Sequence, residues 1–239
     1  MFPDVTGAQF RSPLKIREIC KKLSRVYSDP RLHNKRDPLD ELIFIILSSR
    51  TSELSYLKTY RALRKRFRPW SKILETPKGL VAATIKFGGL SKKKETQIRS
   101  LLCELRNRGD ESLVTLSAKV TKDAEGFLTL LPGVGLKTAR CVLMYSLDRN
   151  VFPVDTHVKR VLSRIGIIEA ERLTAEVQDS IQKAIPPHLR YKLHVNLVAH
   201  GRAICRPRKP LCGSCVVKEM CSYYSSGSGL SGNSLLHTS

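Results

Sequence analysis

Residues 131–140, Leu131-Pro-Gly-Val-Gly-Leu-Lys-Thr-Ala-Arg140, predict a tight glycine turn that leads directly into a helix. Gly133 and Gly135 permit positive φ and allow a ligand to come close to the backbone. The first turn of the helix offers N–H groups without partners and the positive end of the helix dipole, so phosphate is expected to bind there. The candidate contacts are Gly133, Val134, Gly135 and Thr138.

Two other glycine motifs do not fit this stretch. The dinucleotide-binding fingerprint needs a preceding strand and a third glycine, but here a helix is predicted before the turn and Thr138 stands where that glycine would be. A P-loop needs an earlier glycine and a lysine directly after a glycine, and both are missing. A helix-hairpin-helix over about residues 122–147 fits better. Alone, it predicts sequence-independent contact with a nucleic-acid backbone.

Lys137 and Asp155 each allow two interpretations. Lys137 lies in the first helical turn, where it could simply contact phosphate; there the helix dipole disfavours an ammonium, and partial burial would lower the pKa further. A neutral amine can attack an electrophilic carbon and form a Schiff base. Asp155, in Val154-Asp-Thr-His157, is expected to cap the helix that begins at Thr156, and it could also face Lys137 if the two helix starts converge.

Composition indicates a partner of opposite charge. The chain has 239 residues, 41% of them hydrophobic, which is enough for one large domain or two small ones. Its formal net charge of +21 favours a polyanionic partner but does not distinguish DNA, RNA and an anionic membrane. No apolar run is long enough to cross a bilayer, and the first residues lack the pattern of a signal peptide. We therefore expect an intracellular protein with reduced thiols.

Four of the seven cysteines are close together in the sequence, as Cys205-x6-Cys212-x2-Cys215-x5-Cys221. Zinc and an iron–sulfur cluster both accept four cysteines, but structural zinc sites usually have two close pairs that are well separated. The spacing favours [4Fe–4S]. The cluster would brace a basic loop formed by Arg206, Arg208 and Lys209. The remaining cysteines, Cys20, Cys103 and Cys141, are expected to be buried small hydrophobic residues.

The rest of the chain predicts an all-α protein, because no segment alternates with period two. Three lysines, Lys92 to Lys94, oppose the dipole at the start of one predicted helix, which favours an anionic ligand at that end. Residues 1–12 and 222–239 are expected to be disordered tails. Helices are predicted over residues 13–29, 37–47, 53–67, 70–75, 78–86, 92–107, 121–130, 136–147, 155–165, 173–184 and 188–204.

Together these motifs resemble the endonuclease III branch of the helix-hairpin-helix (HhH-GPD) DNA glycosylases over about residues 14–224. The features shared are Leu131 to Ala139, Val154 to His157, Gly201-Arg202 and the four-cysteine spacing. The resemblance implies a [4Fe–4S] cluster and two helical domains with a DNA groove between them. One would be a six-helix barrel over 31–149, and the other a cluster domain formed by 13–30 and 150–221.

The same resemblance implies a bifunctional DNA glycosylase and AP lyase, with Lys137 as the Schiff-base nucleophile and Asp155 as its carboxylate partner. Its substrate would be double-stranded DNA with oxidised pyrimidines or abasic sites, bound by a monomer. The expected location is the cytoplasm or nucleoid of a prokaryote, or the nucleus of a eukaryote. Leu90 stands where the family wedges a side chain into the duplex, and His157 belongs to a shared motif that is expected to contact DNA.

One departure leaves the substrate open. Family members typically have glutamine in the loop after the first barrel helix, facing the base left unpaired, whereas this chain has Arg50 in Leu47-Ser-Ser-Arg-Thr-Ser-Glu53. Arginine reads guanine in a bidentate manner. Arginine in this loop also resembles the pattern of another branch of the family, which removes thymine from T·G mismatches. That branch lacks the lysine found here as Lys137. A mismatch-directed or otherwise specialised glycosylase is therefore an alternative, as is a catalytically silent DNA-binding iron–sulfur protein.

Overall fold

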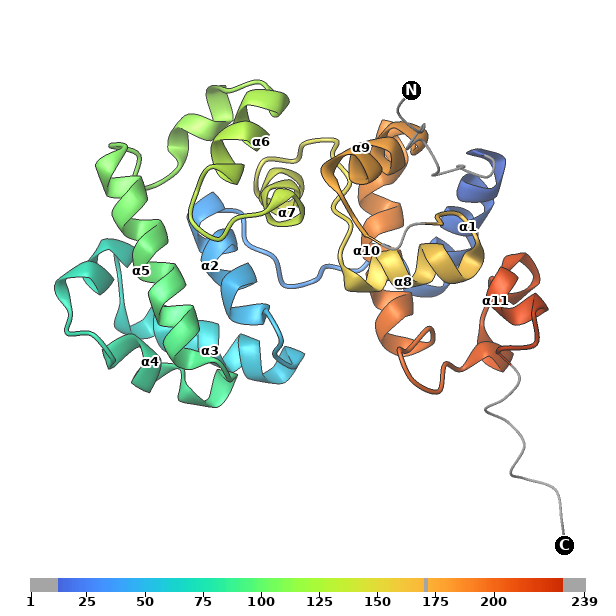
Figure 1. Cartoon of the computed structure of the whole chain (residues 1–239), viewed down its shortest axis with the longest axis horizontal. Helices are drawn as coiled ribbons and strands as arrows, with labels where there is room; N and C mark the ends of the chain where they lie inside the picture. Colours follow the sequence, from blue (N-terminus) through green and yellow to red (C-terminus); the bar gives the residue numbers. More distant parts are fainter. Residues whose placement is uncertain (1–12, 170–171, 230–239) are drawn as a thin grey trace, which may run out of the picture. The chain divides into compact units, whose positions relative to one another are not determined.

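The computed structural model describes residues 13–169 and 172–229, and every regular element in these residues is a helix (Figure 1). The all-α prediction is thereby confirmed. No helix in this part of the chain combines the length and apolar character that crossing a membrane requires. The fold divides into two compact units. We call residues 33–149 the central unit, and the described residues before 33 and after 149 the terminal unit.

The central unit contains six α-helices and three short 3-10 helices. In α2, Asp37 caps the first turn by accepting a hydrogen bond from the backbone N of Asp40 at 2.7 Å, and Pro38 is the first helical residue, as the sequence predicts. The elements are α2 (Pro38–Ser48), α3 (Glu53–Arg66), η1 (Trp70–Glu75), α4 (Leu80–Thr84), η2 (Lys86–Gly88), α5 (Ser91–Asn107), η3 (Val114–Ala118), α6 (Thr121–Thr129) and α7 (Leu136–Ser146).

A helix-hairpin-helix is formed by α6, the turn after it, and α7. Arg140 of α7 is 1% exposed, and its Nε donates to Glu125 of α6 at 2.8 Å. Because a buried guanidinium is costly without a partner, this ion pair fixes how α6 packs on α7. From α5, Gln97 Nε2 donates to the backbone oxygen of Gly133 at 3.1 Å and holds the turn.

In the terminal unit, α10 packs against both α1 and α8 (Figure 1). The shared core includes Ile19 and Leu23 of α1, Val161 of α8, and Leu193 and Leu197 of α10, each 1% exposed or less. The elements are α1 (Pro13–Tyr27), α8 (Thr156–Ile165), α9 (Ala175–Ala184), α10 (Pro187–Ala203), η4 (Cys212–Ser214), η5 (Lys218–Met220) and α11 (Ser222–Ser225).

Two predictions about the ends and the cysteines are wrong in part. Residues 222–225, expected to be disordered, form α11, because Tyr223 and Tyr224 pack against the core of the terminal unit. Residues 1–12 and 230–239, also expected to be disordered, lie outside the described residues. Cys20 and Cys141 are buried as predicted, but Cys103 in α5 is exposed.

Candidate active site and cysteine pocket

Of the two glycines in the turn, Gly133 has the backbone conformation that the sequence predicts and Gly135 does not. Gly133 has φ +72°, as expected, and a Cβ there would lie 2.5 Å from Nε2 of Gln97. Gly135 instead has φ −89°, which any residue can adopt. A Cβ on Gly135 would meet no protein atom within 4 Å. The fold itself therefore does not require glycine at position 135, and the space beside the start of α7 is open to a ligand.

The other two candidate contacts of the turn differ in exposure. Val134 is 5% exposed and its side chain is part of the core, so its predicted contact with DNA would have to be made by its backbone. Thr138 is half-buried in the first turn of α7.

Replacing Gly135 by alanine is expected to weaken DNA binding while the fold is kept. The methyl group fills the open space at the start of α7, where a phosphate would approach the backbone N–H groups. We expect the free energy of unfolding to change by about 1 kcal/mol or less, and the dissociation constant for duplex DNA to rise on the order of tenfold. Fluorescence anisotropy measures the binding.

Gly126 provides the control for that substitution. It lies within α6, and a Cβ there also meets no protein atom within 4 Å. Gly126→Ala should bind DNA as the parent does. If Gly135→Ala also binds with unchanged affinity, the turn is not a phosphate site.

Lys137 is the second residue of α7 and is half-buried. Its charge acts on Glu41 of α2, a carboxyl that is 0% exposed. Burial raises the pKa of Glu41 to about 7, although hydrogen bonds from the Lys35 backbone and from Asn34 and the charges of Lys35 and Lys137 oppose the shift. The Lys35 backbone N is 2.6 Å from Oε2 of Glu41. Lys137 thus has a buried carboxyl within electrostatic reach that titrates near neutral pH.

Sequence reasoning missed Glu41, although there was a signal for it. A carboxylate in the middle of the apolar run Leu39 to Leu47 either faces solvent or is buried with partners. Because this run predicts a helix that is buried on most sides, Glu41 was a candidate for the second case.

Replacing Glu41 by glutamine is expected to stabilise the protein at alkaline pH relative to the parent. A carboxyl whose folded-state pKa is raised costs stability as pH rises from its unfolded pKa to its folded pKa, because only the unfolded chain ionises readily in that window. From about pH 5 to about pH 8.5, the variant should gain about 3 kcal/mol of unfolding free energy relative to the parent. Urea titrations at both pH values measure it. Parallel pH curves for parent and variant would contradict the assignment.

In the terminal unit, Asp155 caps α8, as the sequence predicts. Its Oδ1 accepts a hydrogen bond from the backbone N of Val158 at 2.8 Å, and its side chain is half-buried. His157 lies two residues further on, where burial lowers its pKa. Nδ1 of His157 is 3.1 Å from Nη2 of Arg160. A Cβ added to Gly201 would lie 2.9 Å from the Cβ of His157. The close contact explains why glycine is needed at position 201.

Arg50 and Leu90 lie on two loops of the central unit that one buried lysine joins. Both residues are exposed and have positive φ, +51° and +50°. Lys94 is 3% exposed, and its Nζ donates to the Leu47 oxygen at 2.7 Å, to Thr51 Oγ1 at 2.6 Å and to the Gly88 oxygen at 2.8 Å.

The burial of Lys94 corrects the expectation that the three lysines at the start of α5 favour an external anionic ligand. Its ammonium binds protein oxygens from both loops, so it is not a contact for an external anion. Lys92 and Lys93 are exposed and remain available for one.

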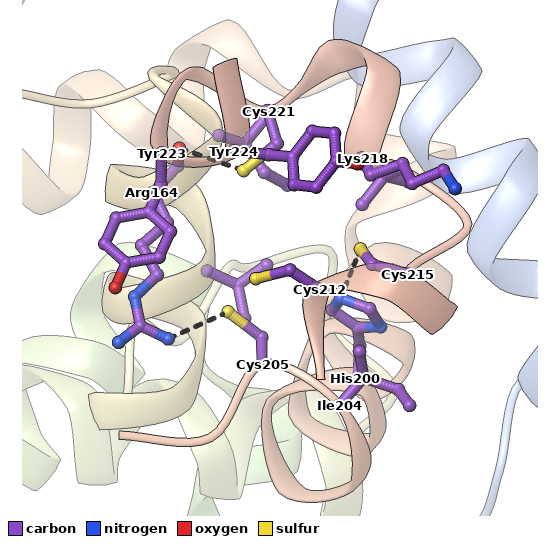
Figure 2. Close-up of a pocket in the computed structure, with 13 residues that line it drawn as sticks. Arg164, His200, Ile204, Cys205, Cys212, Cys215, Lys218, Cys221, Tyr223 and Tyr224 are labelled. Atoms are coloured by element: carbon purple, nitrogen blue, oxygen red, sulfur yellow. Dashed lines mark hydrogen bonds between the residues drawn. The ribbon is translucent and has the colours of Figure 1, made fainter. Parts of the chain in front are cut away.

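The four cysteines of the C-terminal motif line one pocket of the terminal unit (Figure 2). Cys205 Sγ accepts a hydrogen bond from Nη1 of Arg164 at 3.4 Å, and Cys215 Sγ is 3.5 Å from Nε2 of His200. Within the described residues, no three His, Cys, Asp or Glu side chains are close enough to hold a single metal ion. Four thiols around one pocket, with N–H donors beside two of them, fit an iron–sulfur cluster.

The basic loop after Cys205 is held by Arg164. Nη1 of Arg164 donates to the Arg206 oxygen at 2.7 Å and Nη2 to the Pro207 oxygen at 3.0 Å. Arg206, Arg208 and Lys209 are all exposed. The loop presents three cations from a backbone that is fixed next to the cysteine pocket.

Comparison with known families identifies the chain. The model of the HhH-GPD superfamily base excision DNA repair proteins matches residues 43–187, which is more than half of the chain. The chain belongs to this superfamily. The iron–sulfur binding domain of endonuclease III matches residues 205–221, which contain all four pocket cysteines. This member of the superfamily carries a [4Fe–4S] cluster and is a DNA glycosylase and AP lyase of base excision repair.

Relatives of similar length support the assignment. Endonuclease III of Thermotoga maritima is 31% identical over 87% of this chain and 93% of its own length, and that of Escherichia coli is 31% identical over 80% and 86%. Among solved structures, a non-covalent endonuclease III–DNA complex matches with a TM-score of 0.79 and 25% identity, covering 91% of this chain and 98% of the other. A thermostable thymine-DNA glycosylase matches with a TM-score of 0.75 and 25% identity, covering 89% and 98%.

Proposed function

We propose that this glycosylase excises damaged pyrimidines from double-stranded DNA through a Schiff base on Lys137 and then cleaves the strand. The observation that carries the proposal is the position of Lys137. It lies half-buried in the first turn of α7, next to the open space at Gly135. The positive end of the helix disfavours its ammonium form. The superfamily match supports the same reaction, and the enzyme would work in the nucleoid or nucleus, where its DNA is held.

The first step is substitution at the sugar. The damaged nucleotide is flipped out of the duplex, at a cost of a few kcal/mol that damage or mispairing reduces. The neutral Nζ of Lys137 attacks C1′, the glycosidic bond breaks, and the base leaves with the bonding electrons and takes up a proton. Asp155 accepts a proton from the lysine amine and offsets the positive charge that develops on the sugar.

The second step is elimination. O4′ takes up a proton as the C1′–O4′ bond breaks, which opens the sugar ring and gives an iminium between Lys137 and C1′ that makes the protons on C2′ acidic. Transfer of one of these protons to water forms the C2′–C3′ double bond and expels the 3′ phosphate with the bonding electrons, so the strand is cut 3′ to the lesion. Water then hydrolyses the iminium and restores Lys137. When bound, the cluster supplies no chemistry in these steps and braces the basic loop of Arg206, Arg208 and Lys209 against the DNA backbone.

The experiment that tests this proposal compares strand cleavage with and without added alkali. Duplexes that contain thymine glycol, 5-hydroxypyrimidine, uracil or a T·G mismatch are incubated with the holoenzyme under single-turnover conditions. The proposal predicts cleavage of the oxidised pyrimidines without alkali. Base release that yields a cut strand only after alkali treatment would show a glycosylase without lyase activity and would overturn it.

A second candidate is mismatch-directed excision, and Arg50 is the observation that favours it. Arg50 is exposed, and its left-handed backbone conformation is anchored through the neighbouring Thr51, whose Oγ1 donates to the Gly88 oxygen at 2.7 Å and accepts from Lys94. A guanidinium there could read an orphaned guanine through O6 and N7. Likeness to a thymine-DNA glycosylase structure agrees with this candidate.

Replacing Arg50 by glutamine is expected to change which opposite base is preferred. The parent should process a lesion opposite guanine roughly tenfold faster than one opposite adenine, because one bidentate contact is worth about 1–3 kcal/mol. Arg50→Gln should reduce this ratio toward one. Single-turnover rates with the same lesion opposite each base measure it, and an unchanged ratio in the variant would exclude Arg50 as the reader.

A further inference from the structure

His200 lies on α10 beside the cysteine pocket and is 1% exposed (Figure 2). Its Nε2 is 3.5 Å from Sγ of Cys215, and its Nδ1 is 3.0 Å from the hydroxyl of Tyr27 on α1. The rings of Tyr27 and His200 also meet edge to face, with centroids 5.9 Å apart. The imidazole is thus fixed between one partner that can donate or accept and one sulfur.

The two partners determine which ring nitrogen carries the proton. A cysteine that binds iron is a thiolate, which can only accept a hydrogen bond. With the proton on Nε2, the ring donates to Cys215 while Nδ1 accepts from the Tyr27 hydroxyl. With the proton on Nδ1, the lone pair of Nε2 would face the thiolate. The arrangement therefore selects the first tautomer.

We propose that His200, oriented by Tyr27, is a fixed N–H donor to the Cys215 ligand sulfur that raises the reduction potential of the cluster and protects it from oxidative loss. An N–H donor withdraws electron density from the sulfur, and this favours the cluster state with more electrons. Replacing a residue that hydrogen-bonds a metal ligand typically lowers metal affinity or activity on the order of 10–100-fold. The proposal does not depend on the reaction proposed for Lys137.

His200→Leu removes the donor, and His200→Gln keeps an N–H group of similar reach. Each variant is purified as holoenzyme, the reduction potential is measured by voltammetry, and cluster loss in ferricyanide is followed by visible absorption. We expect His200→Leu to shift the potential to more negative values and to lose its cluster roughly tenfold faster. His200→Gln should lie close to the parent. A potential for iron-loaded His200→Leu that equals that of the parent would overturn the proposal.

Tyr27→Phe keeps the experiment decisive if His200→Leu does not load iron. Without the hydroxyl, the imidazole can adopt either tautomer, so the potential should shift in the same direction by a smaller amount. Tyr224→Phe is the matched control, because Tyr224 also lines the pocket. An unchanged potential in Tyr27→Phe, or an equal shift in Tyr224→Phe, would exclude a specific role for the Tyr27–His200 pair.

Discussion

Replacing Lys137 by glutamine is expected to abolish strand cleavage and to slow base release by on the order of 1,000-fold or more. Glutamine has no basic amine, so neither the bond to C1′ nor the iminium that drives elimination can form. The fold should be unaffected, because removing a cation from the first turn of α7 also removes an unfavourable interaction with the helix dipole. Single-turnover assays on a lesion duplex measure both rates, and thermal unfolding checks the fold.

Lys122 offers a closely matched control for that experiment. It is the second residue of α6, as Lys137 is of α7, and it is exposed. Lys122→Gln removes the same charge from the same helix-hairpin-helix, so it should lose some DNA affinity but no lyase activity. Strand cleavage by Lys137→Gln at a rate within tenfold of the parent would show that another amine is the nucleophile.

Replacing Lys94 by methionine is expected to impair both stability and activity. The substitution removes the Lys94 donor from the Leu47 oxygen and leaves the Gly88 oxygen with only the Thr51 hydroxyl as donor, which should cost about 3 kcal/mol of unfolding free energy. It also removes an ammonium that bonds both the loop carrying Arg50 and the loop carrying Leu90. Because small misplacements of positioning groups are costly, we expect kcat/KM to fall on the order of 100-fold. Urea titration and steady-state kinetics measure the two effects.

Lys93→Met is the control for Lys94→Met, since it removes an exposed charge one position away on α5. Its unfolding free energy should stay within about 0.5 kcal/mol of the parent. If both variants have similar stability and kcat/KM, the buried ammonium of Lys94 does not position the loops.

Local sequence rules predicted the helices and their caps well. Asp37 and Asp155 were recognised as N-caps because a carboxylate before a helix has one main structural use, and the structure shows both bonds. The positive φ of Gly133 was predicted because a tight turn before a helix commonly needs a residue that can adopt this conformation, and glycine adopts it without strain. The four cysteines were assigned together because their spacing is specific, and the structure places all four around one pocket.

Features that depend on packing between distant segments were not predictable in this way. Lys94 has the sequence context of a surface lysine, and only the meeting of α5 with two loops makes it a buried donor. The conformation of Gly135 and the packing of Tyr223 and Tyr224 in α11 also depend on tertiary contacts. Burial raises the pKa of Glu41 even though Asn34 and Lys35 donate hydrogen bonds to its carboxyl group, and the apolar run around Glu41 indicates this burial only in part.

The most direct test of the central claim is to locate the covalent bond between enzyme and DNA. The holoenzyme is incubated with an abasic duplex and borohydride, which reduces an iminium to a stable amine, and the digested adduct is mapped by mass spectrometry. We predict that the sugar remnant is attached to Nζ of Lys137. Attachment to another residue, or no adduct with enzyme that still cuts the strand, would contradict the proposed mechanism.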